Sequence, residues 1–536
     1  MIFPSGLQTP GGFFLKIMNP KQTDTLLPIV MLAAPAALLS TSCSTTGPQP
    51  KPNILLIVAD DLGLGDLSCY GSQHISTPHI DSLADGGLRF QNCYATSATS
   101  TPSRFALFTG MYPWRNPDAK ILAGDAPLLI DPSLPTLQKM MQEMGYATAA
   151  IGKWHLGMGY GKLDWNKPIV PSGNTVGFDY TNLIPATVDR VPTVYVENGM
   201  VLGLDESDPI YVDYEKNFEG EPSALTNPEL MTMPWLHGHQ GTIVDGVPRI
   251  GYMKGGHSAR WDDRTMADYF LSKVTSFIES HKDEPFFLYY GLHEPHVPRV
   301  PATRFVGSSG LGCRGDAVVE ADWCVGQVIA KLRQEGLLEN TIVIVTSDNG
   351  AVLQDGYDDG ALEIATAMGH DPDNGLRGGK YSLYDAGTHI PFIVYWKGNI
   401  TPAVSGAYYC QMDLYATFAT MLGAELPEGL DSESYPDVLL GRQLEGGRPT
   451  QIIEAQGRLA YREGNYVLIP AYNGSNFNST GNELGNNPYD TLWDLSSDPA
   501  QTEPIDAPEL KASMKAEFLR LTAGLYSAEI AVDPLE

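Results

Sequence analysis

Two pairs of polar side chains stand directly after strand-like apolar runs. Asp60 and Asp61 follow the run NILLIVA, and Asp348 and Asn349 follow the run TIVIVTS. Carboxylate and amide oxygens are ligands that Ca²⁺ and Mg²⁺ prefer, and carboxylates that lie close together need a cation between them. An isolated Asp-Asp pair is commonly only a turn or a helix cap. Two such pairs at the ends of two strands instead predict a divalent metal site.

The segment STPSRFALFTG, residues 100–110, places serine and threonine ahead of a helix-like apolar stretch. Such residues cap helices, and the free backbone N–H groups of a helix N-terminus favour negative charge. The segment therefore predicts an anion site at the start of a helix.

The segment GKWHLG places Lys153 and His155 two residues apart, after a short strand-like run. On an extended chain, residues i and i+2 point to the same side. Lysine supplies a positive charge for an anion, and histidine exchanges protons near neutral pH. A lone Lys-x-His pair is most often a surface feature, so its meaning depends on the other segments.

The spacing Ser-x-Pro-Ser-Arg-x-x-x-x-Thr-Gly in residues 100–110 resembles the modification signature of type I sulfatases, within the alkaline phosphatase superfamily. The resemblance extends over most of the chain from Pro52 onward, and DDLG and SDNG match the family's metal motifs. It implies that Ser100 is oxidised to formylglycine. Because serine stands where the family more commonly has cysteine, it also implies an anaerobic-type sulfatase-maturing enzyme as a partner. The implied cofactor is Ca²⁺, coordinated by Asp60, Asp61, Asp348, Asn349 and the oxidised Ser100.

Three further motifs, GKWHLG, HEPHVP and RGGKYSLYDAG, match positions that act on sulfate esters in the family. The resemblance implies sulfate binding for Lys153 and Lys380, proton transfer at the formylglycine hydroxyl for His155, proton donation to the leaving sugar oxygen for His296, and positioning of the formylglycine for Arg104. The pattern gives the neighbouring His293 no definite role. The family commonly has Gly-x-Arg-x-Pro where this chain has Gly-Thr-His-Ile-Pro, which leaves open whether His389 takes the place of that arginine.

The segment IPATVDRVPTVYVEN offers an adjacent Asp189 and Arg190. A carboxylate beside a guanidinium can both accept from and donate to a sugar hydroxyl. The segment resembles bacterial sulfatases that act on galactose or N-acetylgalactosamine at the 6-position, where the pair could read the axial O4 hydroxyl. The expected substrate is therefore a sulfated carbohydrate of host or environmental glycans, and an ion pair that only holds the loop is the alternative. His257, Arg260 and Arg314 are further, weaker candidates for substrate contacts.

Apolar runs that alternate with helix-like segments predict the elements that position these residues. The pattern favours an α/β fold with a doubly wound, mostly parallel central sheet and helices on both faces. In such sheets ligands bind beyond the carboxyl ends of the strands, where the polar clusters fall. Residues 52–445 are expected to form this catalytic domain, with long insertions at 160–260. Residues 446–536, with short strand-like runs and one helical segment, are expected to form a smaller C-terminal α+β subdomain with an antiparallel sheet.

The N-terminal segment, residues 1–43, reads as an upstream stretch followed by a signal peptide. The 14 residues LLPIVMLAAPAALL are too few to span a bilayer but suit the apolar part of a signal peptide. Cys43 follows in STSC, which resembles the processing box of bacterial lipoproteins, and Met18 is the expected start. We therefore expect a lipid anchor at Cys43 and a location in the periplasm or at the cell surface of a Gram-negative bacterium. Cleavage without lipidation is the alternative.

Composition limits the partners and leaves two other functions open. The 34 Lys and Arg against 63 Asp and Glu give a net charge of -29, which repels nucleic acid and requires a local cationic pocket for any anionic substrate. Export would permit a disulfide among the remaining five cysteines. A phosphatase or phosphodiesterase of the same superfamily, with two zinc ions, is one alternative, although the 11 histidines form no HxxxH cluster. A glycan-binding lipoprotein that is never matured is the other.

Overall fold

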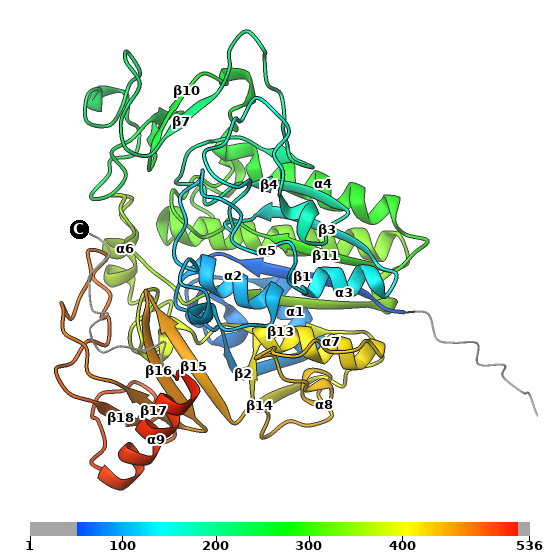
Figure 1. The fold of residues 1–536 in the computed structure, drawn as a ribbon, viewed down its shortest axis with the longest axis vertical. Helices are drawn as coiled ribbons and strands as arrows, with labels where there is room; N and C mark the ends of the chain where they lie inside the picture. Colours follow the sequence, from blue (N-terminus) through cyan, green and yellow to red (C-terminus); the bar gives the residue numbers. More distant parts are fainter. Residues whose placement is uncertain (1–50, 524–536) are drawn as a thin grey trace, which may run out of the picture. The chain divides into compact units, whose positions relative to one another are not determined.

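The centre of the chain is a ten-stranded sheet (Figure 1). The structure is a computed structural model that describes residues 51–523. The predictions for residues 1–43, including the lipid anchor at Cys43, lie outside the described residues. In spatial order the strands are β14 (Ala403–Cys410), β2 (Leu88–Tyr94), β13 (Phe392–Tyr395), β12 (Thr341–Ser347), β1 (Asn53–Ala59), β11 (Phe286–Gly291), β3 (Ala147–Lys153), β4 (Tyr180–Ile184), β5 (Val196–Glu197) and β6 (Met200–Val201).

The five strands from β12 to β4 run parallel to one another. β13 is antiparallel to both of its neighbours, and β2 and β14 beyond it are parallel to each other. The two-residue strands β5 and β6 close the other edge in antiparallel pairing. The mostly parallel sheet predicted from the apolar runs is thus confirmed, and the carboxyl ends of its central strands meet at one edge.

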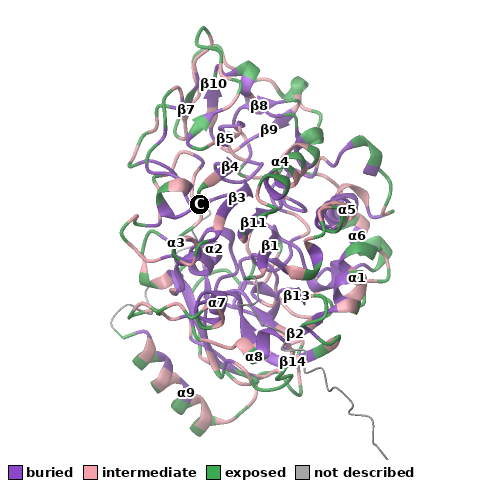
Figure 2. Ribbon diagram, turned by 90° about the vertical axis from the view of Figure 1, so that its right-hand side faces the viewer, coloured by how far each residue is buried: buried purple, intermediate pink, exposed green. Residues whose placement is uncertain are grey.

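Helices cover both faces of this sheet, as predicted (Figure 2). One face packs against α2 (Ser100–Thr109), α3 (Leu137–Glu143) and α7 (Leu414–Leu422), and the other packs against α1 (Pro78–Gly86), α4 (Met266–Ser280) and α5 (Gly312–Gln334). The side chains of β1 alternate between the two faces. Leu56 and Val58 lie in the core on the α2 side, whereas Leu55 and Ile57 lie in the core on the α5 side. A strand buried on both sides must be apolar throughout, which is what the unbroken run of β1 encodes.

Residues 160–260 contain few regular elements, as the sequence indicates. Apart from β4 to β6, this region forms only two small antiparallel pairs. These pairs are β7 (Tyr211–Asp213) with β10 (Tyr252–Lys254), and β8 (Ile243–Val244) with β9 (Val247–Pro248). The strand β4, YTNLI, mixes polar and apolar residues, so no apolar run marks it in the sequence. The remaining short helices are α6 (Ala361–Met368) and α8 (Pro436–Leu439).

A separate antiparallel sheet of four strands lies in the C-terminal part of the chain. Its strands are β15 (Thr450–Ala455), β16 (Arg458–Glu463), β17 (Tyr466–Ile469) and β18 (Thr491–Asp494), and α9 (Pro508–Leu521) packs on it. The Ala98 N–H donates to the Glu454 carbonyl oxygen, and the Glu454 N–H donates to the Thr96 carbonyl oxygen, at 2.9 and 3.0 Å. β15 therefore joins the segment that leads into α2. A domain boundary near residue 445 stays a prediction.

Two further findings concern the described residues alone. Between residues 51 and 523, no helix combines the length and apolar character that crossing a membrane requires. The five cysteines Cys69, Cys93, Cys313, Cys324 and Cys410 are all free thiols, so none of them forms the disulfide that export would permit.

Candidate active site

The two predicted metal-binding pairs meet at one end of the central sheet. β1 and β12 are parallel neighbours whose last residues pair in register, so the residues that follow emerge side by side. The Asp61 N–H donates to Asp348 Oδ1 over 3.3 Å, and Asn349 Nδ2 donates to Asp61 Oδ1 over 2.8 Å. Asp60, Asp61, Asp348 and Asn349 are all buried. The topology thus gathers four oxygen-bearing side chains in one buried cluster.

Ser100 is the first residue of α2 and contacts this cluster. Its hydroxyl lies 3.4 Å from Asp60 Oδ1 and 3.3 Å from Asn349 Oδ1. The preceding Thr99 makes no side-chain cap hydrogen bond, so the helix N-terminus keeps backbone N–H groups for a ligand. All five residues that the sequence predicts as metal ligands therefore lie together.

Lys153, the last residue of β3, reaches both Ser100 and two aspartates. Its Nζ lies 2.7 Å from Ser100 Oγ, 2.5 Å from Asp60 Oδ1 and 3.4 Å from Asp348 Oδ2. Gly152 makes this possible because a Cβ there would lie 1.9 Å from the carbonyl oxygen of Gly291 in β11. Any larger residue would force β3 away from β11 and move Lys153. Burial lowers the pKa of Lys153, and the neighbouring carboxylates oppose that shift.

Arg104 lies one helical turn after Ser100 and holds Asp348. Its Nε and Nη2 donate to Asp348 Oδ2 over 3.0 and 2.8 Å, and its Nη1 contacts the Tyr289 hydroxyl. Burial alone would raise the pKa of Asp348, but Arg104 and then Lys153 hold it well below its usual range. A positioning role for Arg104 would therefore act through Asp348.

His155 lies just beyond β3, where the chain turns. Its φ is 56°, so the extended conformation predicted for GKWHLG ends at Lys153. Its Nε2 lies 2.9 Å from the Leu122 carbonyl oxygen, which makes Nε2 the donor and leaves Nδ1 as an acceptor. Nδ1 is buried and has no hydrogen-bond partner among the described residues. Burial and the charge of Lys153 keep the pKa of His155 well below its usual range, so the ring is neutral at pH 7.

His296 follows β11 and faces the same cluster. Its Nδ1 lies 2.5 Å from the Val297 carbonyl oxygen, and its Nε2 lies 3.8 Å from Asp61 Oδ2. Burial lowers the pKa of His296 well below its usual range, and the charge of Lys380 adds to the shift. The backbone carbonyl thus fixes the ring so that Nε2 is the nitrogen that faces the carboxylates.

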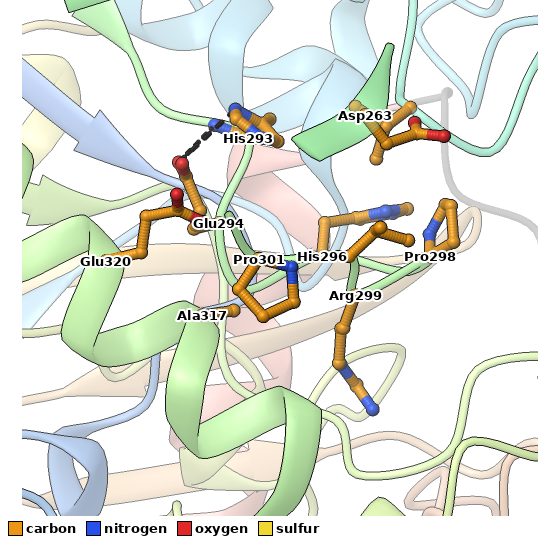
Figure 3. A pocket seen from close by; sticks show the side chains of 11 residues that line it. Asp263, His293, Glu294, His296, Pro298, Arg299, Pro301, Ala317 and Glu320 are labelled. Carbon is orange, nitrogen blue, oxygen red and sulfur yellow. Dashed lines mark hydrogen bonds and ion pairs between the residues drawn. The ribbon is translucent and has the colours of Figure 1, made fainter. Parts of the chain in front are cut away.

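His296 also lines a small pocket together with His293 and three carboxyl groups, those of Asp263, Glu294 and Glu320 (Figure 3). His293 Nδ1 lies 3.3 Å from Glu294 Oε2. Burial raises the pKa of Glu294 to about 7 and that of Glu320 to about 8, and it lowers the pKa of His293 to about 4. His293 is therefore bound to Glu294 in this pocket and does not join the cluster around Ser100.

Lys380 reaches the cluster from the loop between α6 and β13. Its Nζ lies 2.8 Å from Asp61 Oδ2 and 2.7 Å from Asp355 Oδ2, and the Tyr381 hydroxyl lies 3.1 Å from both Asp355 oxygens. Burial alone would lower the pKa of Lys380, but Asp355 and then Asp61 raise it well above its usual range. Asp355 and Tyr381 could not be predicted from the sequence, because no strand end or motif marks Asp355 and only adjacency to Lys380 marks Tyr381.

Asp189 and Arg190 form an ion pair beside this cluster. Arg190 Nη1 lies 2.8 Å from Asp189 Oδ1, and Asp189 Oδ2 lies 3.0 Å from His239 Nε2. Burial would lower the pKa of Arg190, but Asp189 raises it, with smaller contributions from Tyr381 and Asp355. The pair therefore lies within electrostatic range of the Lys380 loop. His239, from the irregular insertion, could not be predicted from the sequence either.

Three other residues named from the sequence have different surroundings. The His257 side chain is 66% exposed and lies 2.8 Å from Asp208, whereas both ends of the Arg314 guanidinium are occupied by the buried Asp66 at 2.6 and 2.7 Å. A substrate contact by His257 or Arg314 stays a prediction. His389 Nδ1 lies 2.6 Å from Asp385 Oδ2, and its Nε2 lies 2.6 Å from the Gln91 carbonyl oxygen in β2. Both ring nitrogens of His389 therefore link the Asp385 segment to β2.

The donor set around Asp60 fits a hard divalent cation. Ligand atoms of Asp60, Asp61 and His296 all lie within 4.8 Å of one another. Asp60 Oδ2 is buried and has no hydrogen-bond partner among residues 51–523, and burial raises the pKa of Asp60 to about 8 even though Lys153 opposes the shift. A cation at this oxygen would remove the cost of burying the charge. Apart from His296, the donors of this cluster are carboxylate and amide oxygens, which favour calcium or magnesium.

Comparison of the sequence with known proteins gives consistent matches. The profile of a family described as "Sulfatase" matches residues 52–424. An N-acetylgalactosamine-6-O-sulfatase of Bacteroides thetaiotaomicron is 47% identical over 491 residues, which cover 90% of this chain and 95% of that protein. Human arylsulfatase A is 32% identical over 505 residues, which cover 88% of this chain and 86% of that protein.

Comparison of the structure agrees with these matches. One solved structure comes from work on the metabolism of multiple glycosaminoglycans by Bacteroides thetaiotaomicron. It superposes on this chain with a TM-score of 0.86 and is 47% identical in sequence. The match covers 88% of this chain and 99% of that chain.

Proposed function

This chain belongs to the sulfatase family, and from that membership we propose that it removes sulfate from the 6-position of galactose or N-acetylgalactosamine at the end of a glycan. Hydrolysis of sulfate esters on carbohydrate is the activity of the chain. The 6-position and the galacto sugar are supported by the 47% identical relative named as an N-acetylgalactosamine-6-O-sulfatase. The Asp189–Arg190 pair, 2.8 Å apart, supports a sugar contact beside the reacting group.

One observation carries the proposal: the side chain of Ser100 lies where nucleophile, cations and metal ligands converge. Its oxygen is within 3.4 Å of Asp60, Asn349 and Lys153. It also starts a buried helix whose N-terminal backbone groups favour an anion. A serine that only capped a helix would not need three charged or metal-type partners.

We assign the metal to Asp60, Asp61, Asp348, Asn349 and position 100. A bound Ca²⁺ would polarise oxygen atoms and neutralise developing charge, and formylglycine at position 100 would supply the nucleophile. The unpartnered Asp60 Oδ2 supports this assignment. Arg104 holds Asp348 at 2.8 Å, which keeps that carboxylate aimed at the site.

Lys153 and Lys380 bind the sulfuryl oxygens. An ammonium has three N–H donors, and Lys380 uses two of them on Asp61 and Asp355, which leaves one for the substrate. Lys153 contacts Asp60, Ser100 and Asp348, so it must exchange one of these contacts for a sulfuryl oxygen. Preorganised donors of this kind stabilise charge that develops in the transition state and do not have to reorganise when the reaction occurs.

The two histidines move protons in opposite directions. Nδ1 of His155 is a buried, unpartnered acceptor, so it takes a proton from the hydroxyl at position 100. Nε2 of His296 gives a proton to the leaving sugar oxygen. The entering sulfate monoester raises the pKa of His296 toward the working pH, because a nearby negative charge favours the imidazolium.

The finer predictions about cell biology rest on the sequence. We propose an anaerobic-type maturing enzyme for Ser100, export, and a lipid anchor at Cys43 in the periplasm or at the cell surface.

The alternative of a two-zinc phosphatase requires additional histidine and aspartate ligands. Among residues 51–523, the group with metal-ligand spacing comprises only Asp60, Asp61 and His296.

A panel of defined sulfated sugars tests the proposal. The protein is produced with an anaerobic-type maturing enzyme, and mass spectrometry of the peptide that contains residue 100 establishes the loss of two hydrogens. We expect sulfate release from the 6-sulfates of galactose and N-acetylgalactosamine, and little from N-acetylglucosamine 6-sulfate, whose O4 is equatorial. Equal activity on both epimers would contradict the role of Asp189 and Arg190. Activity of unmodified protein would contradict the role of position 100.

A further inference from the structure

Asp355 is a buried carboxylate that touches the proposed sulfate subsite without belonging to the metal cluster. Its side chain contacts Lys380 Nζ at 2.7 Å and the Tyr381 hydroxyl at 3.1 Å. Both of its carboxylate oxygens are engaged by these two residues, and it makes no hydrogen bond or ion pair with Ser100 or with any of the four residues Asp60, Asp61, Asp348 and Asn349. Burial would raise the pKa of Asp355, but Lys380 lowers it, so the group is ionised.

The structure holds this carboxylate in place through a strained residue. Tyr381 has a φ of 74°, which is costly for a side chain of this size. Two hydrogen bonds from outside its own segment maintain it: its N–H donates to the Ala98 carbonyl oxygen over 2.9 Å, and its carbonyl oxygen accepts from Arg458 over 2.9 Å. The Tyr381 hydroxyl is thereby fixed at Asp355, and the segment that leads into Ser100 is one of the anchors.

Asp355 changes the balance of charge around the substrate. Arg104 is matched by Asp348 at 2.8 Å, and Lys153 is matched by Asp60 at 2.5 Å. Lys153 also lies 3.4 Å from Asp348, and Lys380 contacts both Asp61 at 2.8 Å and Asp355 at 2.7 Å. The three cations thus face four carboxylates, which leaves one negative charge in excess. Asp355 is the one of the four that we do not assign to the metal, and it contacts the lysine that we assign to the sulfuryl group.

This extra charge matters because sulfate and phosphate monoesters have the same shape and different charge. A sulfate monoester carries one negative charge. A phosphate monoester carries nearly two above its second pKa of about 6. In a buried site each additional like charge nearby is costly, because the effective dielectric constant is far below that of water.

We propose that Asp355 is a specificity-determining residue that favours monoanionic sulfate esters over dianionic phosphate esters in this pocket. The inference rests on the proposed function, since it takes the Lys380 subsite to be the one that binds the sulfuryl group. Lys380 attracts either anion. Asp355 repels the second charge of the phosphate and leaves the sulfate ester nearly unaffected.

Equilibrium binding tests the inference separately from catalysis. In an S100A background, with Ca²⁺ present, N-acetylgalactosamine 6-sulfate and 6-phosphate are titrated calorimetrically at pH 8. We expect D355N to improve phosphate binding relative to sulfate binding by at least about tenfold, which corresponds to about 1.4 kcal/mol. In the matured enzyme, the ratio of kcat/KM for phosphate to that for sulfate should rise in the same direction.

Two matched variants separate charge from hydrogen bonding. D355E keeps a carboxylate at residue 355. Y381F also keeps the Asp355 charge but removes the hydroxyl that contacts it. Both variants should therefore leave the ratio of phosphate to sulfate affinity within about twofold of that of the parent protein. A D355N protein that melts like the parent and shows an unchanged ratio would overturn the inference. A D355E protein whose ratio shifts as far as that of D355N would do the same.

A comparison of three ligands tests the role of charge without a variant at residue 355. The 6-H-phosphonate of the same sugar has phosphorus at its centre but only one negative charge. With Asp355 present it should bind like the sulfate, and binding as weak as that of the phosphate would refute the role of charge. If the matured protein releases no sulfate while these binding ratios behave as expected, the proposed function fails and the charge selectivity of Asp355 stands.

Discussion

Lys153 and Lys380 each contact an aspartate that we assign to the metal. Lys153 Nζ lies 2.5 Å from Asp60, and Lys380 Nζ lies 2.8 Å from Asp61. The lysines partly neutralise carboxylates that would otherwise repel one another, but Asp60 Oδ2 still lacks a partner among the described residues. At the residue scale, the site is therefore organised for one more cation.

Calcium should stabilise the folded protein. Binding to the folded state alone adds about 2.7 kcal/mol at a free concentration of 100 times Kd, which raises the melting midpoint by a few degrees. Differential scanning calorimetry of chelator-treated protein, before and after Ca²⁺ addition, measures the shift. D61N should lose most of it because it removes a carboxylate ligand. A full shift in D61N, or one that only Zn²⁺ produces, would refute the assigned ligands.

The pocket beside His296 should make stability depend on pH. The pKa of Glu320 rises from 4.5 to about 8 on folding, so the buried acid contributes stability below pH 4.5 that is lost as pH rises through 8. E320Q keeps the acceptor for the Ala302 N–H and cannot ionise. Urea unfolding at pH 5 and pH 8 should show wild type losing at least about 1 kcal/mol more than E320Q over this interval. Equal losses in both proteins would argue against a buried acid at residue 320.

At the scale of elements, the parallel pairing of β1 and β12 and the docking of β15 bring distant segments to Ser100. Ser97 Oγ donates to Glu454 Oε2 over 2.5 Å, and the Gly457 N–H donates to Glu454 Oε1 over 2.5 Å. Glu454 therefore ties the C-terminal sheet to the segment that starts α2. This link sets the direction from which Ser100 enters the site.

Removal of the Glu454 side chain should loosen that link. E454A leaves the buried Ser97 hydroxyl and the exposed Gly457 N–H without their acceptor, so we expect it to lower the free energy of unfolding by about 1–3 kcal/mol and to lower kcat. Chemical denaturation and steady-state kinetics measure both. E463A, on the exposed face of the same sheet, is the control and should change stability by less than about 0.5 kcal/mol. If E454A behaved like E463A, the docking of β15 would have no part in placing Ser100.

The sequence predicts those parts of the fold and the site that depend on short-range patterns. β1 and β12 are unbroken apolar runs with polar ends, so their burial and the cluster at Asp60 could be anticipated. β2, LRFQNCY, mixes polar and apolar residues because it lies near the sheet edge, and it was missed. Asp355 and His239 depend on where irregular loops return to the site, and the left-handed turn at His155 depends on tertiary packing. No local pattern encodes these features.

At the scale of the whole molecule, the acidic surface and the cationic site oppose each other. The net charge of -29 repels polyanions at long range, whereas the pocket attracts one sulfate group at short range. This balance suits an enzyme that binds the terminal sugar of a glycan better than one that binds along a long sulfated polymer.

Salt should therefore favour the larger substrates. Raising the ionic strength from about 20 to about 150 mM shortens the Debye length and screens the surface more than the buried pocket. We expect kcat/KM for a multiply sulfated oligosaccharide to rise about two- to fivefold relative to that for a sulfated monosaccharide. A fall in this ratio would indicate a cationic surface that binds the polymer, contrary to the net charge.

The central claim is that an oxidised residue 100, held among the metal ligands and two lysines, hydrolyses a carbohydrate sulfate ester. The most direct test is sulfate released from N-acetylgalactosamine 6-sulfate, measured by ion chromatography, for matured wild type and for S100A produced in the same way. We predict continuous turnover by wild type and a rate at least about a thousandfold lower for a folded S100A. Comparable sulfate release by S100A would contradict the account.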